Sequence, residues 1–519
     1  MKRTSPLFAV SFFLVATQVS PAAKPNLLEE ARRALAESIP QVAVQKCRAV
    51  LKTPALKPDE KRMALLTLGE GLLRIGKFDE ALQELQPLVD ARDQSALLLQ
   101  ADLFASSGQW SRALPAYRAL ANQPEAPIAA FLGQVESLHA LGQTARAADR
   151  LEELLRRHPE QTTARLRLAS LQVEAKQSEK AQRTLAQIEP QRPLERKWKQ
   201  FIEARLLLVA DRPDAARASF EELVREHHEL PENLLVGATL GIAEARIVMN
   251  GYDAADQVLE SFINRYPESS LLELVFGRLD HIYSHQDDPP ESELQKWGRM
   301  APPRRAALAR YYLARLQLFE KKYDKAGRTL DQFIATYPAH SLLPYVHLLQ
   351  ADLALARDRL PQAIAALEAA ARHATTDELR AEIELRTGYA HHRAGDFLLA
   401  SKFFDLAAGR SSRLRETALF DGALSSLQQR NWDRYFEQYQ ELSNRFPQSE
   451  LRAELILEQG LAQARANDSR AQETIELFLR HFPRHARTGE AKLALAELSF
   501  ATQNIGQAAD YLQAVNTSA

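Results

Sequence analysis

The sequence predicts an all-α fold, a right-handed superhelical α-solenoid of stacked helix pairs. Three observations predict it. One short pattern recurs along the chain, small residues recur at fixed places around it, and no segment alternates apolar and polar residues as a β-strand does. Because self-similarity at a period of about 20 to 50 residues is typical of repeat architectures, we expect a chain that grows unit by unit without one closed core.

The recurring pattern is a turn residue, an apolar residue two places later, a small residue at plus five and an apolar residue at plus nine. One unit reads Gly76, Phe78, Ala81 and Leu85. About fourteen units follow one another at a mean spacing of about 36 residues. Their turn residues are Ser38, Gly76, Gly108, Gly142, Lys176, Asp211, Asn250, His285, Lys321, Asp358, Gly395, Arg430, Ala466 and Gln503.

Each unit is expected to fold as helix, tight turn, helix and stop. The plus-five residue is alanine in nearly every unit, and Tyr435 is the clear exception. A second small residue lies seven places before the turn, as at Gly69 and Gly388, so two facing helices can approach closely. Proline near plus seventeen ends many units, because the residue before a proline avoids helical angles. These prolines are Pro159, Pro193, Pro267, Pro338, Pro447 and Pro483.

This pattern closely resembles the tetratricopeptide repeat. The family has small residues at its eighth and twentieth positions, glycine or asparagine at the turn, apolar residues at seventeen and twenty-four and proline at thirty-two, and the likeness runs from about Leu27 to the C-terminus. Departures are local, since the family's tyrosine four places before the turn is Leu72 or Gln172 here. Endings such as Tyr266-Pro267 and Phe446-Pro447 look like those of tetratricopeptide proteins of the bacterial cell envelope.

One unit is degenerate. Its turn near His285 contains Asp287-Asp288-Pro289-Pro290, and its second helix is predicted to shrink to about Glu291 to Met300. Leu294 and Trp297 still fall at the apolar positions. We therefore expect an N-terminal array over 24–284, a degenerate repeat over 285–303 that acts as a hinge or as a binding loop, and a C-terminal array over 304–519.

The N-terminal residues 1–23 are predicted to be a signal peptide. Lys2 and Arg3 precede an apolar run over 7–19, and small residues follow it, with cleavage expected after Ala22 or Ala23. The alternative, a membrane anchor, needs about 20 apolar residues, and this run is shorter and contains Ser11. We therefore expect export to the periplasm or beyond and a mature chain without a membrane span.

Composition and motifs argue against nucleic-acid binding and against catalysis. The net charge is −1, so the chain has no excess of basic residues for phosphates. No phosphate-binding glycine loop, nucleophile elbow, paired cysteines or zinc-protease motif occurs, and we expect no enzyme activity, no cofactor and no metal site. Adjacent histidines, as in His227-His228 and His391-His392, point about 100° apart on a helix and rarely share a metal ion. Cys47 falls on a plus-nine position and is predicted to be a buried apolar residue.

The resemblance implies that the first helix of each unit lines the concave face and that its fifth, ninth and twelfth positions point into it. The ninth position often holds an acid, which predicts a groove for basic segments of a protein partner. Arg205 and Arg315 interrupt this acidic ladder, and an ordinary charged surface is the alternative. The candidate partner-binding residues are Glu70, Asp102, Glu136, Glu244 and Asp352, with Glu497 in the same register.

The function expected from these features is an exported scaffold that holds extended or helical segments of partner proteins in its groove. A different class of function, glycan binding by an outer-membrane solenoid, is the alternative. Solenoids of that class carry long loop insertions with exposed aromatic residues, whereas this chain has short turns and four tryptophans.

Overall fold

A computed structural model describes residues 26–53, 56–123 and 126–516, and the predicted signal peptide lies outside them. The described residues form 28 α-helices, two short 3-10 helices and no strand. Contacts divide the chain into two compact units, unit 1 up to Tyr312 and unit 2 from Leu313, and the boundary falls inside helix α17, Pro303–Phe319. The predicted boundary segment, 285–303, lies just before this helix, and its role as a hinge stays a prediction.

The helices of unit 1 are α1 (Leu27–Ala36), α2 (Pro40–Leu51), α3 (Pro58–Arg74), α4 (Phe78–Asp90), α5 (Gln94–Ser106), α6 (Trp110–Ala121), α7 (Ile128–Ala140), α8 (Thr144–Arg157), α9 (Thr162–Glu174), α10 (Ser178–Ala186), α11 (Pro193–Val209), α12 (Pro213–Arg225), η1 (His227–Glu229), α13 (Glu232–Asn250), η2 (Tyr252–Ala254), α14 (Asp256–Arg265), α15 (Leu272–Tyr283) and α16 (Glu291–Trp297). The helices of unit 2 that follow α17 are α18 (Tyr323–Thr336), α19 (Leu343–Ala356), α20 (Leu360–His373), α21 (Asp377–Arg393), α22 (Phe397–Arg410), α23 (Arg415–Gln428), α24 (Trp432–Arg445), α25 (Leu451–Arg465), α26 (Ala471–His481), α27 (Thr488–Ala501) and α28 (Ile505–Asn516).

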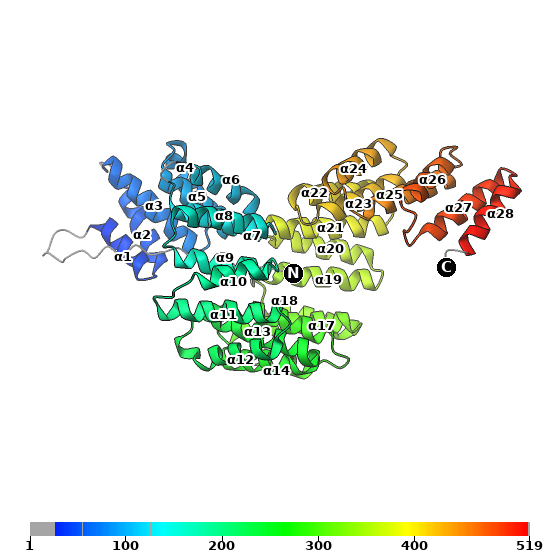
Figure 1. Ribbon diagram of the computed structural model, residues 1–519. Helices are drawn as coiled ribbons and strands as arrows, with labels where there is room; N and C mark the ends of the chain where they lie inside the picture. The colour runs from blue at the N-terminus through cyan, green and yellow to red at the C-terminus, as the bar shows by residue number, and fades with distance from the viewer. Residues whose placement is uncertain (1–25, 54–55, 124–125, 517–519) are drawn as a thin grey trace. The chain divides into compact units, whose positions relative to one another are not determined.

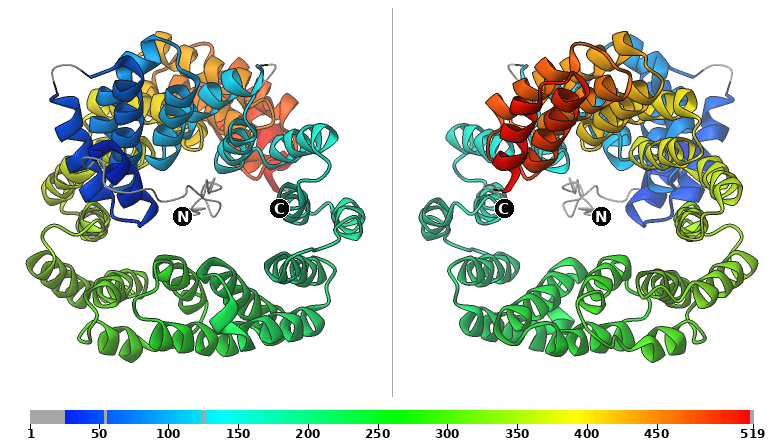
Figure 2. Two further views of the ribbon diagram at one scale, coloured as in Figure 1. Left: turned by 90° about the vertical axis from the view of Figure 1, so that its left-hand side faces the viewer. Right: turned by 90° about the vertical axis from the view of Figure 1, so that its right-hand side faces the viewer.

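Within each unit the helices form pairs that stack in chain order (Figures 1 and 2). The first helix of a pair packs on its own partner and also on the first helix of the next pair, as α3 does with α4 and α5, and α23 with α24 and α25. This arrangement confirms the predicted all-α solenoid.

The turns confirm most of the predicted register. Residues with positive φ occupy eleven of the predicted turn positions: Ser38, Gly76, Gly108, Gly142, Lys176, Asp211, Lys321, Asp358, Gly395, Arg430 and Gln503. In two of the repeats the residue with positive φ comes one place later than predicted, at Gly251 and Asn467 instead of Asn250 and Ala466. Glycine adopts positive φ more readily than asparagine does, and asparagine more readily than alanine, so in both cases the turn falls on the residue that tolerates it better.

The small residues explain how the helices of one pair approach each other. The alanines at plus five are all buried, and Tyr435, the exception, is buried too and donates its hydroxyl to the carbonyl oxygen of Leu455 at 3.1 Å. At minus seven, a Cβ added to Gly388 would lie 2.6 Å from the ring of Phe404, the plus-nine residue of the same unit. The minus-seven and plus-nine positions therefore face each other in this pair, and Gly69 and Leu85 do the same in theirs.

The degenerate repeat is packed like its neighbours. Its second helix, α16, is shorter than predicted and ends at Trp297. Leu294 and Trp297 are buried as the register requires, and the indole Nε1 donates to Asn264 Oδ1 at 2.8 Å. The ring of Phe276 packs edge-on against Trp297, so this unit has an aromatic core of its own.

The predicted role of proline as a stop is confirmed at five of the six positions, where proline follows the end of α8, α14, α18, α24 or α26. Pro193 instead occupies the first turn of α11. Proline is equally suited to that place because its missing N–H has no helical partner there.

Candidate partner-binding surface

The predicted acidic residues lie on the first helices of successive pairs. Glu70 is on α3, Asp102 on α5, Glu136 on α7 and Glu244 on α13, all in unit 1, whereas Asp352 is on α19 in unit 2. Their environments differ. All five make a polar contact within the chain, and they differ in how much of each side chain stays exposed.

At the start of the row, Glu70 and Asp102 are both half-buried. Glu70 pairs with Arg74 of its own helix at 2.5 Å, and 44% of its side chain is exposed. Asp102 accepts a hydrogen bond from the hydroxyl of Tyr117. Burial raises the pKa of the Asp102 carboxyl, and the nearby charge of Glu70 adds to this effect. Asp102 thus anchors a tyrosine of the repeat core.

Glu136 belongs to a polar network that joins three successive pairs. Its carboxylate accepts two hydrogen bonds from Arg167 on α9, at 2.9 and 2.7 Å. Arg167 also lies 3.2 Å from Nδ1 of His139, and Nε2 of the same ring lies 2.9 Å from Glu174. The charge of Glu174 in turn acts on Arg205 of α11.

The protonation of His139 follows from these contacts. A guanidinium can only donate, so Nδ1 accepts from Arg167 and the ring proton resides on Nε2, where it is donated to Glu174. The interrupting residue Arg205 is therefore part of the same network as Glu136. The negative charges of Glu136 and Glu174 are thus offset by the positive charges of Arg167 and Arg205 on helices α9 and α11.

Glu244 and Asp352 also pair with an arginine on the first helix of the next pair. Glu244 pairs with Arg278 of α15, and Asp352 with Arg386 of α21 at 2.9 Å. Burial raises the pKa of the Asp352 carboxyl, and the charge of Arg386 opposes that shift. About half of the Glu244 side chain and two fifths of the Asp352 side chain stay exposed, at 47% and 40%.

One further contact between the first helices of successive pairs was not predicted. The hydroxyl of Tyr389 on α21 donates to Asp421 Oδ2 on α23 at 2.5 Å. Tyr389 holds the register of Glu136 and Asp352, and Asp421 holds that of Arg167 and Arg386. Burial raises the pKa of Asp421 to about 6. The spacing of about 32 residues between such partners was the signal, and it is readable only once the repeat register is known.

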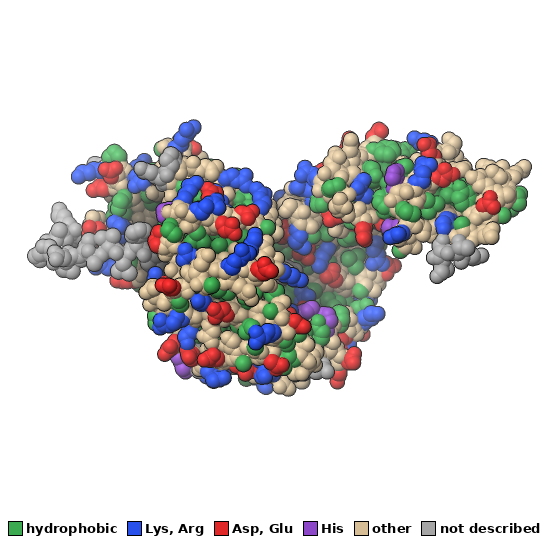
Figure 3. Space-filling model, in the orientation of Figure 1, with side chains coloured by type: hydrophobic (Ala, Val, Ile, Leu, Met, Phe, Trp, Pro, Cys, Tyr) green, Lys and Arg blue, Asp and Glu red, His purple; other side chains and the backbone are tan. Residues whose placement is uncertain are grey.

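We call these contacts the rungs: Glu136 with Arg167, Glu244 with Arg278, Asp352 with Arg386, and Tyr389 with Asp421. They hold successive first helices together, so most of the predicted acidic ladder is neutralised within the chain. Charges of both signs also intermingle over the face drawn in Figure 3. Whether these acids bind a partner stays a prediction, and Glu70 and Glu244 are the most exposed of the four whose side chains are ion-paired.

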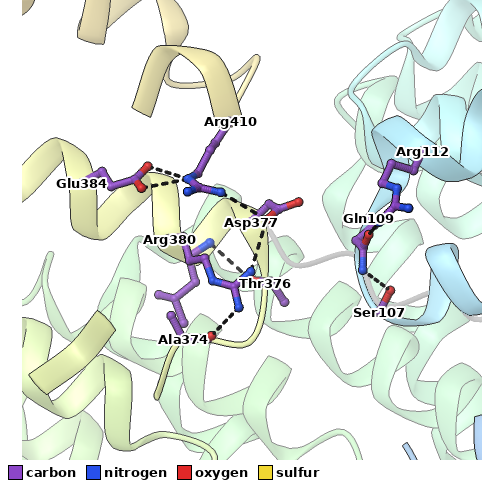
Figure 4. A network of polar contacts seen from close by, with 10 residues as sticks. Ser107, Gln109, Arg112, Ala374, Thr376, Asp377, Arg380, Glu384 and Arg410 are labelled. Carbon is purple, nitrogen blue, oxygen red and sulfur yellow. Dashed lines mark hydrogen bonds and ion pairs between the residues drawn. The ribbon is translucent and has the colours of Figure 1, made fainter. Parts of the chain in front are cut away.

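Other polar networks tie the helix ends of a single unit. In unit 2, Arg410 of α22 pairs with Glu384 at 2.8 Å and with Asp377 at 3.8 Å, and Arg380 donates to the carbonyl oxygen of Ala374 at 3.1 Å (Figure 4). In unit 1, Gln109 bridges Ser107 and Arg112 in the turn before α6. Both networks satisfy groups at helix ends and turns, which is a structural role.

The outward face of α22 is unusually apolar. Leu398, Leu399 and Leu406 are 72%, 42% and 39% exposed, and exposed Lys402 lies one turn from Leu398 and from Leu406. In other units the equivalent positions are mainly charged or polar: Asp79, Glu80 and Pro87; Asp324, Lys325 and Gln332; Asp433, Arg434 and Glu441. Lys402 has no acidic partner in the described part of the chain.

The predicted burial of Cys47 is confirmed, and burial raises the pKa of its thiol to about 11. The ring of His391 stacks on Phe403, and Nδ1 of His392 lies 2.8 Å from Ser425 Oγ. Across the described residues, no group of three or more histidine, cysteine or acidic side chains is arranged to hold a metal ion. None of the described helices combines the length and apolar character of a membrane span.

Solved structures that resemble the chain are distant. The structure titled Naa15/Naa10 bound to HypK-THB is 14% identical with a TM-score of 0.37, over 95% of this chain and 93% of that one. The Cut9-Hcn1 hetero-tetramer of the APC/C is 13% identical with a TM-score of 0.37, over 95% of this chain and 93% of that one. Yeast Tom70 is 14% identical with a TM-score of 0.35, over 95% of each chain. Scores this low say nothing about function, and no curated protein sequence matches the chain.

Family models match along much of the array. Three models, each described as a tetratricopeptide repeat, match residues 138–204, residues 66–127 and 348–413, and residues 238–269 and 308–340. The matched segments lie in both compact units and coincide with helix pairs of the structure. The family resemblance drawn from the turn and alanine pattern is thereby confirmed, and the chain is a tetratricopeptide repeat protein.

Proposed function

We propose that this chain is an exported scaffold that binds partner proteins on its helix repeats in the bacterial cell envelope. Tetratricopeptide repeats support the binding of protein partners. The observation that carries the proposal is the continuity of the described residues, in which helix pairs follow one another from α1 to α28 and the polar side chains tie pair to pair. Lys2, Arg3 and the apolar run after them support export.

The exposed acids favour basic segments of a partner. Glu70, Glu244 and Asp352 are the ladder acids with the most exposed side chains, and each is held by one arginine. A partner arginine or lysine can approach the exposed side of these carboxylates without breaking the core. Asp102 and Glu136 contribute by holding their helices in place, because their carboxylates are already occupied.

The face of α22 favours a helical segment. Three leucines on one face of a helix match the apolar stripe of an amphipathic helix. Lys402 lies between Leu398 and Leu406 without a counter-ion among the described residues, so the occupant we propose carries an acidic side chain opposite it.

Site-specific photo-crosslinking tests the partner surface. A photoreactive residue is placed at Glu70, Glu244 or Leu398 in the producing cell, and at exposed Gln83 on the second helix α4 as the matched control. We expect discrete protein adducts from the first three positions and none from Gln83. Equal labelling at all four positions would refute a defined surface. A glycan-array signal without protein adducts would favour glycan binding.

Export is tested separately. The N-terminal residue of the protein recovered from the cell envelope is expected to be Ala23 or Lys24, which follows from the predicted cleavage sites. Recovery of the chain from the cytoplasm with Met1 in place would refute export and leave the scaffold role standing.

A further inference from the structure

Two histidines lie together at the end of α15. His281 is in the last turn of the helix, and His285 follows four residues later in the turn before α16. Both side chains are exposed, and their ring centroids are 4.5 Å apart. His285 lies beyond the last helical residue, and the turn after α15 brings its ring back beside that of His281.

The ring of His285 is held in one orientation. It stacks on Tyr252 with the centroids 4.5 Å apart and the planes 18° from parallel. Its Nδ1 lies 2.8 Å from the carbonyl oxygen of His281, which can only accept, so Nδ1 carries the proton. The lone pair is therefore on Nε2. Metal-binding histidines characteristically donate their second ring nitrogen to such an oxygen.

His281 has ring nitrogens that are available. No hydrogen bond to either nitrogen joins it to another described residue, and its ring meets Tyr252 edge-on at 5.9 Å. Arg278 lies three residues before His281 on the same helix, and its guanidinium is paired with Glu244. The two exposed rings thus lie beside each other and beside Tyr252, and the contacts of His285 with Ser284 Oγ at 3.2 Å and with the carbonyl oxygen of His281 both involve Nδ1.

We propose that His281 and His285 together bind a divalent late transition-metal ion. Two imidazole nitrogens and water molecules complete the coordination, because the described residues contain no third histidine, cysteine or acidic ligand in range. Imidazole ligands suit copper, zinc and nickel, and Cu²⁺ binds most tightly among the divalent ions of this series.

Another pair of histidines provides a control. The rings of His347 and His373 are 6.1 Å apart and nearly parallel, at 18°. Parallel stacked rings direct their lone pairs away from a common point, and Nδ1 of His347 is already bonded to Gln350 at 2.9 Å. This pair has the same chemistry as His281 and His285 but lacks their arrangement.

Titration of the untagged full chain with Cu²⁺ tests the proposal, by calorimetry and by electron paramagnetic resonance. The variants are His281→Gln, His285→Gln and their combination, with His347→Gln/His373→Gln as the control. We expect one tight equivalent of Cu²⁺ with two nitrogen ligands in the native and control proteins. Each single variant is expected to lose at least tenfold in affinity.

Circular dichroism will check that every variant is folded. We expect this of the His281 and His285 variants because both side chains are exposed. Undiminished binding in the double variant would overturn the proposal. So would an equal loss in the control, or a loss in only one of the two single variants, because chelation requires both rings.

Discussion

Replacement of Gly388 by alanine tests the packing that defines the repeat. The added Cβ would lie 2.6, 2.7 and 2.9 Å from three ring atoms of Phe404, all closer than van der Waals contact allows. Phe404 is buried and also packs edge-on against the ring of Tyr389, with the centroids 5.4 Å apart. It therefore cannot withdraw without displacing a second aromatic ring.

The expected magnitude comes from two opposing terms. Overpacking a core by one methyl group costs about 1 to 3 kcal/mol. Alanine gains about 1 kcal/mol over glycine in a helix interior. We expect Gly388→Ala to lower the free energy of unfolding by about 1 kcal/mol, from the difference of these terms.

Gly327 provides the matched control, because it lies inside α18 and a Cβ there would meet only Leu353 at 3.5 Å, an ordinary contact. Gly327→Ala should raise the free energy of unfolding by up to about 1 kcal/mol. Adding Phe404→Leu to Gly388→Ala should restore part of the loss, since a Cβ added to Gly69, in the equivalent place, would lie 3.0 Å from Leu85 and so overlap less than the one beside Phe404.

Urea denaturation measures the global effect, and hydrogen exchange in α21 and α22 measures the local one, because repeat arrays need not unfold in one step. If Gly388→Ala proves as stabilising as Gly327→Ala, with no coupling to Phe404, the close approach of the two helices would not be a constraint and the reasoning fails.

Three further predictions concern buried polar groups. Arg167→Ala leaves Glu136 without its counter-ion and should cost about 2 kcal/mol, seen as faster hydrogen exchange in α7 and α9, while a Glu136→Gln/Arg167→Met double variant should lose less. Because the pKa of Asp421 is about 6 in the folded chain and 3.8 in the reference state, its contribution to stability is greatest below pH 4 and is lost as pH rises through 6. Between pH 4 and pH 7.5 this group should change the free energy of unfolding by about 3 kcal/mol, and Asp421→Asn should remove that change in urea titrations. An unchanged pH dependence in the variant would contradict the assignment. Cys47, whose pKa is raised to about 11, should resist a thiol reagent at pH 8 until urea unfolds α2, whereas immediate labelling would contradict its burial.

The fold was readable from sequence because its constraints are local. An alanine five residues after a left-handed turn is required by two helices that belong to one unit, and the pattern within about 36 residues contains both. Two turns predicted at Asn250 and Ala466 lie one residue later, at Gly251 and Asn467, although Ala255 and Ala471 are buried as the register requires. Attention to which residue tolerates positive φ would have placed them correctly.

The candidate surface was less predictable. A row of acids at one register position indicates charge on a face, but the charge that remains depends on what stands opposite in the next unit. Glu136 and Arg167 are 31 residues apart, and their pairing appears only when the helices are stacked. Asp102 shows a different limit, since its hydrogen bond comes from Tyr117 on the second helix of its own pair and not from the next pair.

The rungs also determine the order in which the units can be joined. If one whole unit, residues 359–395, were excised from turn to turn, the cut ends would match and the alanine and proline pattern would continue unbroken. Asp352 would then stand opposite Asp421, acid against acid, in place of Arg386. At the rungs, a side chain on one first helix is thus matched to the side chain opposite it on the next first helix. Shuffling or shortening this array therefore requires matching of charges as well as of helices.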